Sequence, residues 1–158
     1  MIAMEDFSIL IEALKSAKHV GVLTGAGIST LSNIPDFRGA KGMYNDPAAM
    51  RIFDIDWFDR DPSIYYKGCR ELIYGLHSYE PNIVHYALKR LEDLGIVKGI
   101  ATQNIDMLHH KAGSKNVWEV HGSPRVHHCR WCGKAVGFDE VVRIVESGAD
   151  VARCSCGG

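Results

Sequence analysis

Short apolar runs alternate with amphipathic helical segments over residues 5–120, and this alternation limits the folds that are open to the chain. Runs typical of strands occupy residues 19–23, 96–101 and 117–120, and helical periodicity occupies residues 5–18, 82–94 and 106–111. Helices between strands carry the chain back across a sheet, so that successive strands run parallel. The sequence therefore predicts an α/β fold with a parallel sheet.

Composition and charge narrow the class of protein. The 158 residues are 46% hydrophobic, and 18 Lys and Arg balance 19 Asp and Glu. This length suits one domain, or one domain with a small module, and the balanced charge does not favour nucleic acid or a membrane surface as a partner. The longest apolar stretch, near residues 20–23, is far shorter than the roughly 20 residues of a membrane helix, and no secretory leader is visible. We expect a cytoplasmic protein.

The chain divides into three kinds of sequence. Residues 44–79 are dense in aromatic side chains, and Asp61-Pro62-Ser63 is typical of a helix start, which predicts a helical insertion. From residue 123 onward the chain carries two close cysteine pairs around a short helical stretch, residues 138–147. We therefore assign residues 1–43 and 80–122 to a Rossmann-like α/β part, 44–79 to the insertion and 123–158 to a small module that contains the cysteine pairs.

A glycine turn follows the first predicted strand. Gly25, Ala26 and Gly27 precede a segment that can begin a helix, where backbone N–H groups and the helix dipole can hold a pyrophosphate. The complete dinucleotide-binding fingerprint is absent, because position 30 is Thr. A turn that serves only close packing of strand against helix is the alternative interpretation.

Polar residues gather at two further places. Gln103, Asn104, Ile105 and Asp106 follow the second strand, at the sheet edge where α/β proteins bind ligands. Asn104 or Asp106 can instead cap a helix. The second place is the loop Asp36-Phe37-Arg38, in which Arg can meet a phosphate and Phe can cover a flat ring. An ordinary loop with an ion pair is the alternative there.

One histidine has a distinctive position in the sequence. His121 follows the third strand, so we expect it at the same sheet edge, and an imidazole titrates near neutrality, as a general base requires. The pairs His109-His110 and His127-His128 are expected on the surface as solvated residues.

Four of the five cysteines form two close pairs. Cys129 and Cys132 are separated from Cys154 and Cys156 by 21 residues. Two such knuckles bring four thiolates to one tetrahedral Zn²⁺, which is a structural site without an open position. The spacing within the second pair is one residue shorter than is usual for zinc ligands. The alternative to a zinc site is a redox-active dithiol. Cys69 stands alone in a helical stretch and is expected in the core.

Taken together, the motifs resemble one family, the sirtuins, which are NAD-dependent protein deacylases of the silent information regulator class. Each motif alone is weak, but several unrelated motifs in the family's order are specific. The motifs that carry the resemblance are Gly25-Ala26-Gly27-Ile28-Ser29, Ile34-Pro35-Asp36-Phe37-Arg38-Gly39, Pro81-Asn82-x-x-His85, Thr102-Gln103-Asn104-Ile105-Asp106, Leu108-His109-x-x-Ala112-Gly113, Glu119-Val120-His121-Gly122 and the paired cysteines.

The resemblance implies a role for each motif. It places Gly25, Ala26, Gly27 and Ser29 beside the cofactor NAD, and Asp36, Phe37 and Arg38 in a cofactor-binding loop. It implies that Gln103 contacts the ribose, and that Asn104, Ile105 and Asp106 line the nicotinamide pocket. It makes His121 the catalytic base, and Cys129, Cys132, Cys154 and Cys156 the ligands of one structural zinc.

The activity that the resemblance implies is NAD-dependent deacylation of lysine in a protein or peptide, which yields nicotinamide, O-acyl-ADP-ribose and free lysine. No Tyr-x-x-Arg spacing occurs in residues 42–72, which favours acetyl over acidic acyl groups. NAD hydrolysis or ADP-ribosyl transfer is one alternative, since both share the step in which nicotinamide leaves. The other is a non-catalytic zinc ribbon that binds protein, because residues 123–158, with five basic and four acidic side chains, lack the charge for nucleic acid.

The sequence departs from the family pattern in two ways. Asn33 stands where sirtuins usually carry Gly, which we interpret as a tolerated loop change. Sirtuins also continue well beyond the second cysteine pair, through the second half of the nucleotide-binding sheet. We therefore expect a fragment whose incomplete sheet has an uncovered edge, with little activity and low stability by itself.

Overall fold

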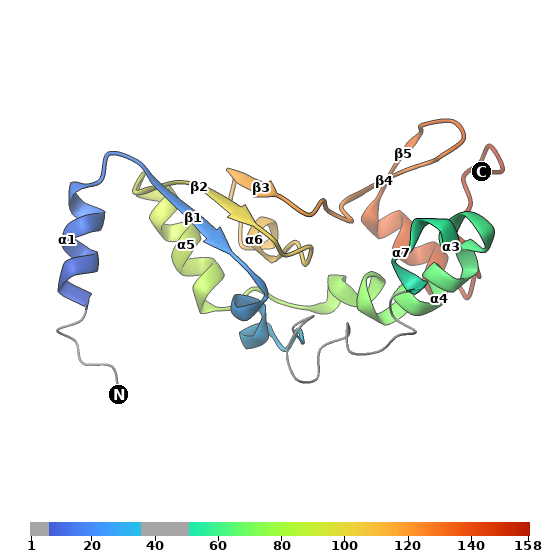
Figure 1. Ribbon diagram of the computed structural model, residues 1–158, viewed down its shortest axis with the longest axis horizontal. Coiled ribbons are helices and arrows are strands. Elements are labelled where there is room, and N and C mark those ends of the chain that lie inside the picture. The colour runs from blue at the N-terminus through green and yellow to red at the C-terminus, as the bar shows by residue number, and fades with distance from the viewer. Residues whose placement is uncertain (1–6, 36–50) are drawn as a thin grey trace.

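The computed structural model describes residues 7–35 and 51–158. Figure 1 shows two lobes side by side along the long axis, one built on a sheet and one built mainly on helices. Among these residues, no helix is both long enough and apolar enough to cross a bilayer. The predicted cofactor loop, Asp36, Phe37 and Arg38, lies outside the described residues.

The first lobe is built on a parallel sheet of three strands. The strands are β1 (Val20–Thr24), β2 (Val97–Thr102) and β3 (Val117–Glu119), in the order β1-β2-β3. The pairing aligns Thr24 with Thr102, and Thr102 with Glu119, so the three strands end at one common edge. The predicted α/β class with a parallel sheet is confirmed.

Helices cover one face of this sheet. α5 (Ile83–Asp93) and α6 (Leu108–Lys111) lie below it in Figure 1, and Ile100 of β2 is fully buried. The other face carries Leu23 and Trp118, which are 69% and 61% exposed. The Trp118 ring lies so close over Gly99 that any Cβ there would clash with it. β1 is therefore exposed on one face, because helices cover only the other face of the sheet.

α5 begins with a capping box. The Asn82 side chain accepts a hydrogen bond from Val84 N, and the His85 side chain accepts one from Asn82 N. The predicted apolar face of this helix is only partly correct. Its fully buried side chain is His85, whereas Ile83 is 74% exposed and Leu94 is 55% exposed, because the sheet covers a narrower stripe than the sequence periodicity suggests.

The first helix is shorter than predicted, and the second is a 3₁₀ helix. α1 (Ser8–Ser16) falls within the predicted range 5–18 but buries none of its side chains. After the glycine turn the chain forms a 3₁₀ helix, η2 (Ala26–Ser32), which ends at Asn33 with φ of 64°. Glycine and asparagine adopt this left-handed conformation at the lowest cost, which explains why Asn33 can stand where sirtuins usually carry Gly.

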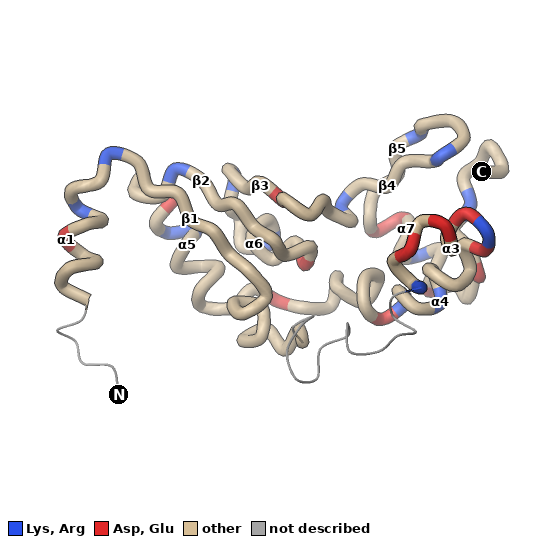
Figure 2. The backbone as a smooth tube through the Cα atoms, in the orientation of Figure 1, with Lys and Arg blue, Asp and Glu red and all other residues tan. Residues whose placement is uncertain are grey.

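The second lobe combines helices with a hairpin. Its elements are α3 (Ile55–Arg60), α4 (Pro62–Leu72), η4 (Tyr74–Ser78), the antiparallel strands β4 (Val126–His128) and β5 (Ala135–Gly137), and α7 (Phe138–Glu146). Asp61 caps α4 by accepting a hydrogen bond from Ser63 N, and Pro62 is the first helical residue, so the predicted helix start is confirmed. Acidic residues gather on α3 and at the start of α7 (Figure 2).

We call this second lobe the cysteine lobe. One hydrophobic core joins its two segments, residues 55–78 and 126–146. The Tyr74 ring lies 5.8 Å from the Tyr66 ring and 6.3 Å from the Phe138 ring. His127 stacks on the same column and is half-buried, so it is not the solvated residue that the sequence predicted. Cys69 is fully buried, as expected. The buried cluster comprises Tyr66, Cys69, Ile73, Tyr74, Leu76, Phe138, Val141, Val142 and Val145.

Candidate active site and metal centre

Buried polar side chains meet where β1 and β2 end. Asn104 Nδ2 donates to the carbonyl of Gly25 and to the hydroxyl of Ser29, each at 3.0 Å. The Ser29 hydroxyl in turn donates to Asp106 Oδ2 at 2.5 Å. Ser29, Asn104 and Asp106 are all buried. The structure therefore brings these three predicted site residues into one hydrogen-bonded cluster.

Asp106 serves the fold as well as this cluster. Its second oxygen, Oδ1, accepts a hydrogen bond at 2.9 Å from Leu108 N, the first N–H of α6, although the N-cap residue of that helix is Met107. Met107 follows with φ of 64°, a conformation that costs a non-glycine residue about 1 kcal/mol. Met107 and the predicted site residue Ile105 both pack against the core of the cysteine lobe. That packing explains how the unfavourable backbone conformation is maintained.

The glycine turn leaves open space at the same sheet edge. Gly25 has an extended backbone with φ of −141°, and Ala26, the first residue of η2, is half-buried. A Cβ on the exposed Gly27 would meet no other atom within 4 Å. Close packing therefore does not explain Gly27, and the open side leaves room for a phosphate group near the first N–H groups of η2.

His121 is attached to this edge through its ring. Its Nδ1 lies 2.9 Å from the carbonyl oxygen of Gln103, and Gln103 N donates to the carbonyl of Thr24 at 3.0 Å. Because a carbonyl only accepts, His121 Nδ1 must be the donor, so the lone pair of a neutral ring is on Nε2. The ring is exposed, so Nε2 is accessible to a reacting group. The side chain of Gln103 is exposed at the same edge.

Two buried histidines lie behind the cluster. His109 was expected on the surface, but it is 2% exposed because α6 turns it inward, with Nε2 2.9 Å from Thr24 Oγ1. Its ring centroid lies 4.9 Å from that of His85, which is fully buried. Burial lowers the pKa of both rings, and that of His109 falls to about 4, with His85 adding to the effect and Asp106 opposing it. Both rings are therefore neutral near pH 7.

Asn82 is a site-shaping residue for which sequence reasoning assigned no role. Besides capping α5, its Nδ2 donates to the carbonyl of Ile28 at 2.7 Å and to the hydroxyl of Ser32 at 2.8 Å. These bonds hold η2, and with it Ser29, against the start of α5. The Pro81-Asn82-x-x-His85 motif was the available signal, but it gives no indication of a partner some 50 residues away.

The four paired cysteines form a candidate metal centre. Their sulfur atoms all lie within 4.8 Å of one another, with Cys129 Sγ 3.6 Å from Cys156 Sγ and Cys132 Sγ 3.7 Å from Cys154 Sγ. A tetrahedral Zn²⁺ with Zn–S bonds of about 2.3 Å needs sulfur separations of about 3.8 Å, whereas a disulfide needs about 2.0 Å. The Cys156 N–H lowers the pKa of the Cys154 thiol to about 6, which favours the thiolate. The donor set fits a structural zinc.

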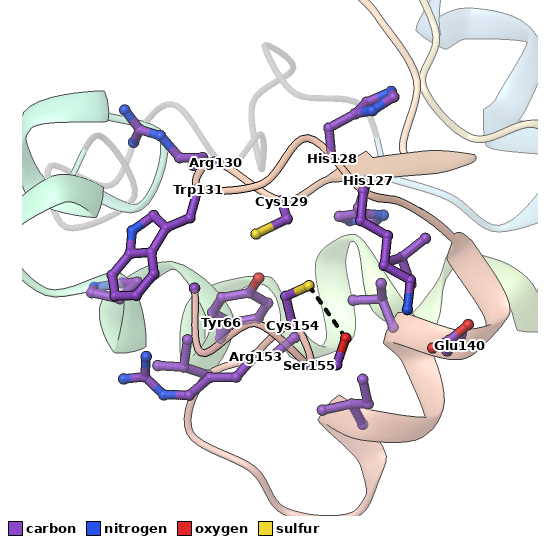
Figure 3. A pocket seen from close by; sticks show the side chains of 18 of the residues that line it. Tyr66, His127, His128, Cys129, Arg130, Trp131, Glu140, Arg153, Cys154 and Ser155 are labelled. Carbon is purple, nitrogen blue, oxygen red and sulfur yellow. Dashed lines mark hydrogen bonds between the residues drawn. The ribbon is translucent and has the colours of Figure 1, made fainter.

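An open hollow of about 630 Å³ lies beside the cysteines. Figure 3 shows Tyr66 and His127 on its wall, with the sulfur atoms of Cys129 and Cys154 directed into it. None of the residues at the end of β1 or β2 lines this hollow. The metal centre and the sheet-edge cluster are therefore separate features.

Comparison with known proteins agrees with this geometry. The Sir2 family profile matches residues 25–158. NAD-dependent protein deacetylases of Saccharolobus solfataricus and Thermotoga maritima are 43% and 40% identical over 93% and 96% of the chain, which spans 59% of the length of each. A solved Sir2–p53 peptide–NAD⁺ complex superposes with a TM-score of 0.83 at 38% identity, covering 96% of this chain and 60% of that one. A Sir2 bound to acetylated peptide gives 0.81 at 35% identity, with the same coverage. The chain belongs to the Sir2 family.

Proposed function

We propose that this chain provides the nicotinamide-binding and proton-transfer groups of an NAD-dependent protein lysine deacetylase. The observation that carries the proposal is the buried Ser29–Asn104–Asp106 cluster beside the exposed His121, at the common end of parallel strands. Rossmann-like sheets bind dinucleotides at this edge. The names of the relatives support the same activity, although the chain spans 59% of their length.

The residues present fit NAD. Both Nδ2 hydrogens of Asn104 are used within the protein, so Asn104 offers its Oδ1 acceptor to a carboxamide N–H. The Gly25–Gly27 turn would hold the phosphates and Gln103 the ribose, and Asp36, Phe37 and Arg38 would belong to the cofactor-binding loop that the family resemblance implies. When bound, NAD supplies the ribose carbon that receives the acyl oxygen as nicotinamide leaves.

His121 would act as the general base. Its Nε2 lone pair can take a proton from a ribose hydroxyl, and the Gln103 carbonyl then stabilises the imidazolium through Nδ1–H. The buried cluster keeps its polar groups fixed, so that no solvent rearrangement is needed during the reaction. The products would be nicotinamide, O-acyl-ADP-ribose and free lysine.

The other parts of the chain would have supporting roles. Residues 1–43 and 80–122 would form the NAD-binding part, 44–79 the helical insertion and 123–158 the module held by zinc. Four thiolates leave zinc no open position, so its role would be structural. The substrate would be an acetylated lysine in a protein or peptide, and a structural neighbour that is a Sir2 bound to acetylated peptide supports this. Cysteines that lie in close pairs along the sequence but form no disulfide suit a reducing compartment such as the cytoplasm.

The test is an assay of an acetyl-lysine peptide with NAD, read by mass spectrometry of the products. It is run on the chain, and on a chimera that adds the part of the Saccharolobus solfataricus relative that the chain does not cover. In the active protein, His121→Ala should lower deacetylation by about 10²–10⁴-fold, the usual contribution of a general base. Exchange of labelled nicotinamide into NAD should fall less, because it precedes the proton transfer.

Two further variants sharpen the assay. Asp106→Asn should impair exchange and deacetylation together, because it alters the pocket that orients nicotinamide. His19→Ala changes an exposed histidine before β1 and should leave both rates unchanged. Release of free ADP-ribose, or modification of the protein by ADP-ribose without acyl transfer, would refute deacetylation in favour of NAD hydrolysis or ADP-ribosyl transfer.

A further inference from the structure

A circuit of hydrogen bonds, closed by two peptide links, passes through the proposed active site and returns by way of His109. From the β1 end, Gly25 O accepts from Asn104, which also donates to Ser29, and Ser29 donates to Asp106. Asp106 in turn accepts from the N–H that begins α6. One residue further along that helix, His109 Nε2 closes the circuit on Thr24 Oγ1 at 2.9 Å. The four-residue helix α6 therefore holds the cluster from both sides.

We propose that His109 is a positioning residue of the active site, which fixes the end of β1 and the adjoining glycine turn relative to Asp106 through the hydroxyl of Thr24. The inference rests on the proposed function, since it concerns the residues assigned there to nicotinamide. Thr24 is 5% exposed, and its carbonyl already accepts from Gln103 N. The bond to His109 is the contact through which its side chain reaches α6.

The surroundings require a neutral His109. His85 Nδ1 accepts from Asn82 N at 3.3 Å, so His85 carries its proton on Nε2 and presents an N–H group to the interior. His109 Nδ1 is buried without a hydrogen-bond partner among the described residues. A proton on His109 Nδ1 would add a second buried N–H donor beside the N–H of His85 Nε2. Among the charged and titratable groups near His109, only the Asp106 carboxylate favours the charged form, while His85 and His110 oppose it.

A neutral imidazole suits a positioning role. It can hold Thr24 in one geometry without adding charge next to Asp106, whose two oxygens are committed to Ser29 and to the α6 N-terminus. A cation there would compete for the carboxylate and weaken its bond to Ser29. The role thus requires a hydrogen-bonding group that stays uncharged, rather than any buried residue of similar size.

Matched pairs of variants test the proposal. Thr24→Val removes the hydroxyl and keeps the shape, whereas Thr24→Ser keeps the hydroxyl. His109→Leu removes the bond, whereas His109→Gln keeps an N–H that can reach Thr24. Nicotinamide is titrated into each folded variant of the chain, and its affinity is measured from the NMR shifts of the Ser29 and Asp106 amides. We expect Thr24→Val and His109→Leu to weaken binding about fivefold, and the two conservative variants to stay within about twofold.

The outcomes separate positioning from mere structural support. A purely structural role would lower the unfolding midpoint of the variants but leave nicotinamide affinity equal within each pair, which would overturn the proposal. If the unmodified chain binds no nicotinamide, the proposed function fails for this chain, and the ligand-free spectra decide the positioning role. Thr24→Val should then shift the Ser29 and Asp106 amide signals while Thr24→Ser does not. Equal spectra for the two variants would overturn it.

Discussion

Ser29 links the polar cluster, because its hydroxyl accepts from Asn104 and donates to Asp106. Ser29→Ala would leave one Asp106 oxygen without this donor in a residue that is 6% exposed. We expect the free energy of unfolding, measured by urea denaturation, to fall by about 1–3 kcal/mol. Thr30→Ala removes an exposed hydroxyl that donates to Gly27 O. This control should change the free energy of unfolding by less than about 0.5 kcal/mol. Equal losses in the two variants would contradict the assigned network.

Acid should weaken the fold through His109. Burial lowers the pKa of His109 from 6.5 to about 4, so between these values the unfolded chain binds a proton that the folded chain does not. The stability that this group contributes is fully present above about pH 6.5 and is lost as the pH falls toward 4, by at most about 1.4 kcal/mol per pH unit. Urea midpoints at pH 7.5, 5.5 and 4.5 would show the decline.

His109→Gln provides the control for this pH dependence, because glutamine does not titrate. Carboxylates that become protonated in acid destabilise both proteins alike, so the difference between the two profiles isolates the histidine. The variant should show a flatter profile between pH 6.5 and 4.5. Parallel profiles would show that His109 does not titrate in this range.

Residue types were easier to predict than their neighbours in space. Ser29, Asn104, Asp106 and His121 were identified from motifs, and the structure brings the first three together and ties the fourth to Gln103. The surface prediction for His109 was wrong, because a histidine is polar and a four-residue helix has too few positions to show which side faces inward.

Among the elements, α5 shows how one cap can serve two helices. The Asn82 side chain caps α5 and also binds Ile28 O and Ser32 Oγ of η2, whereas the Asp61 side chain caps only α4. Replacing an N-cap by alanine costs about 1 kcal/mol. We expect Asp61→Ala to lower the free energy of unfolding by that amount, and Asn82→Ala to lower it by about 2 kcal/mol, because two more hydrogen bonds are lost. Urea denaturation that ranks Asp61→Ala as the more damaging would refute this linking role.

The elements themselves were predictable to differing degrees. The three strands of the parallel sheet were found, because each combines an apolar run with a following turn. The hairpin of β4 and β5 was not predicted, since three-residue strands are too short for alternation to show. The burial of α5 was overestimated, because periodicity identifies an apolar stripe but not what covers it.

At the scale of the whole molecule, two segments distant in sequence share the cysteine lobe. Tyr66 and Tyr74 stack with Phe138, a contact that no local pattern indicates. Polar contacts then hold the lobes together near the proposed active site. Lys111 of α6 donates to Tyr79 O at 2.6 Å, and Arg125 donates to His110 Nε2 at 2.9 Å. Both partners lie at the border of the cysteine lobe, because Tyr79 follows η4 and Arg125 precedes β4.

Loss of zinc should loosen the cysteine lobe and leave the sheet in place. The metal would connect the hairpin turn to the segment around Cys154, and that hairpin leads directly into α7, whose side chains form the core with α4. Cys132→Ser removes one ligand, so zinc content should fall and amide exchange in α7 and α4 should rise at least about tenfold. Amides of β1 and β2 should keep their protection, because their ladder lies in the other lobe.

Cys69→Ala damages the same core without touching the metal, so it should lower stability while one zinc per chain remains. Retention of a full zinc equivalent in Cys132→Ser, or equal loss of protection in β1 and α7, would contradict this division of the molecule.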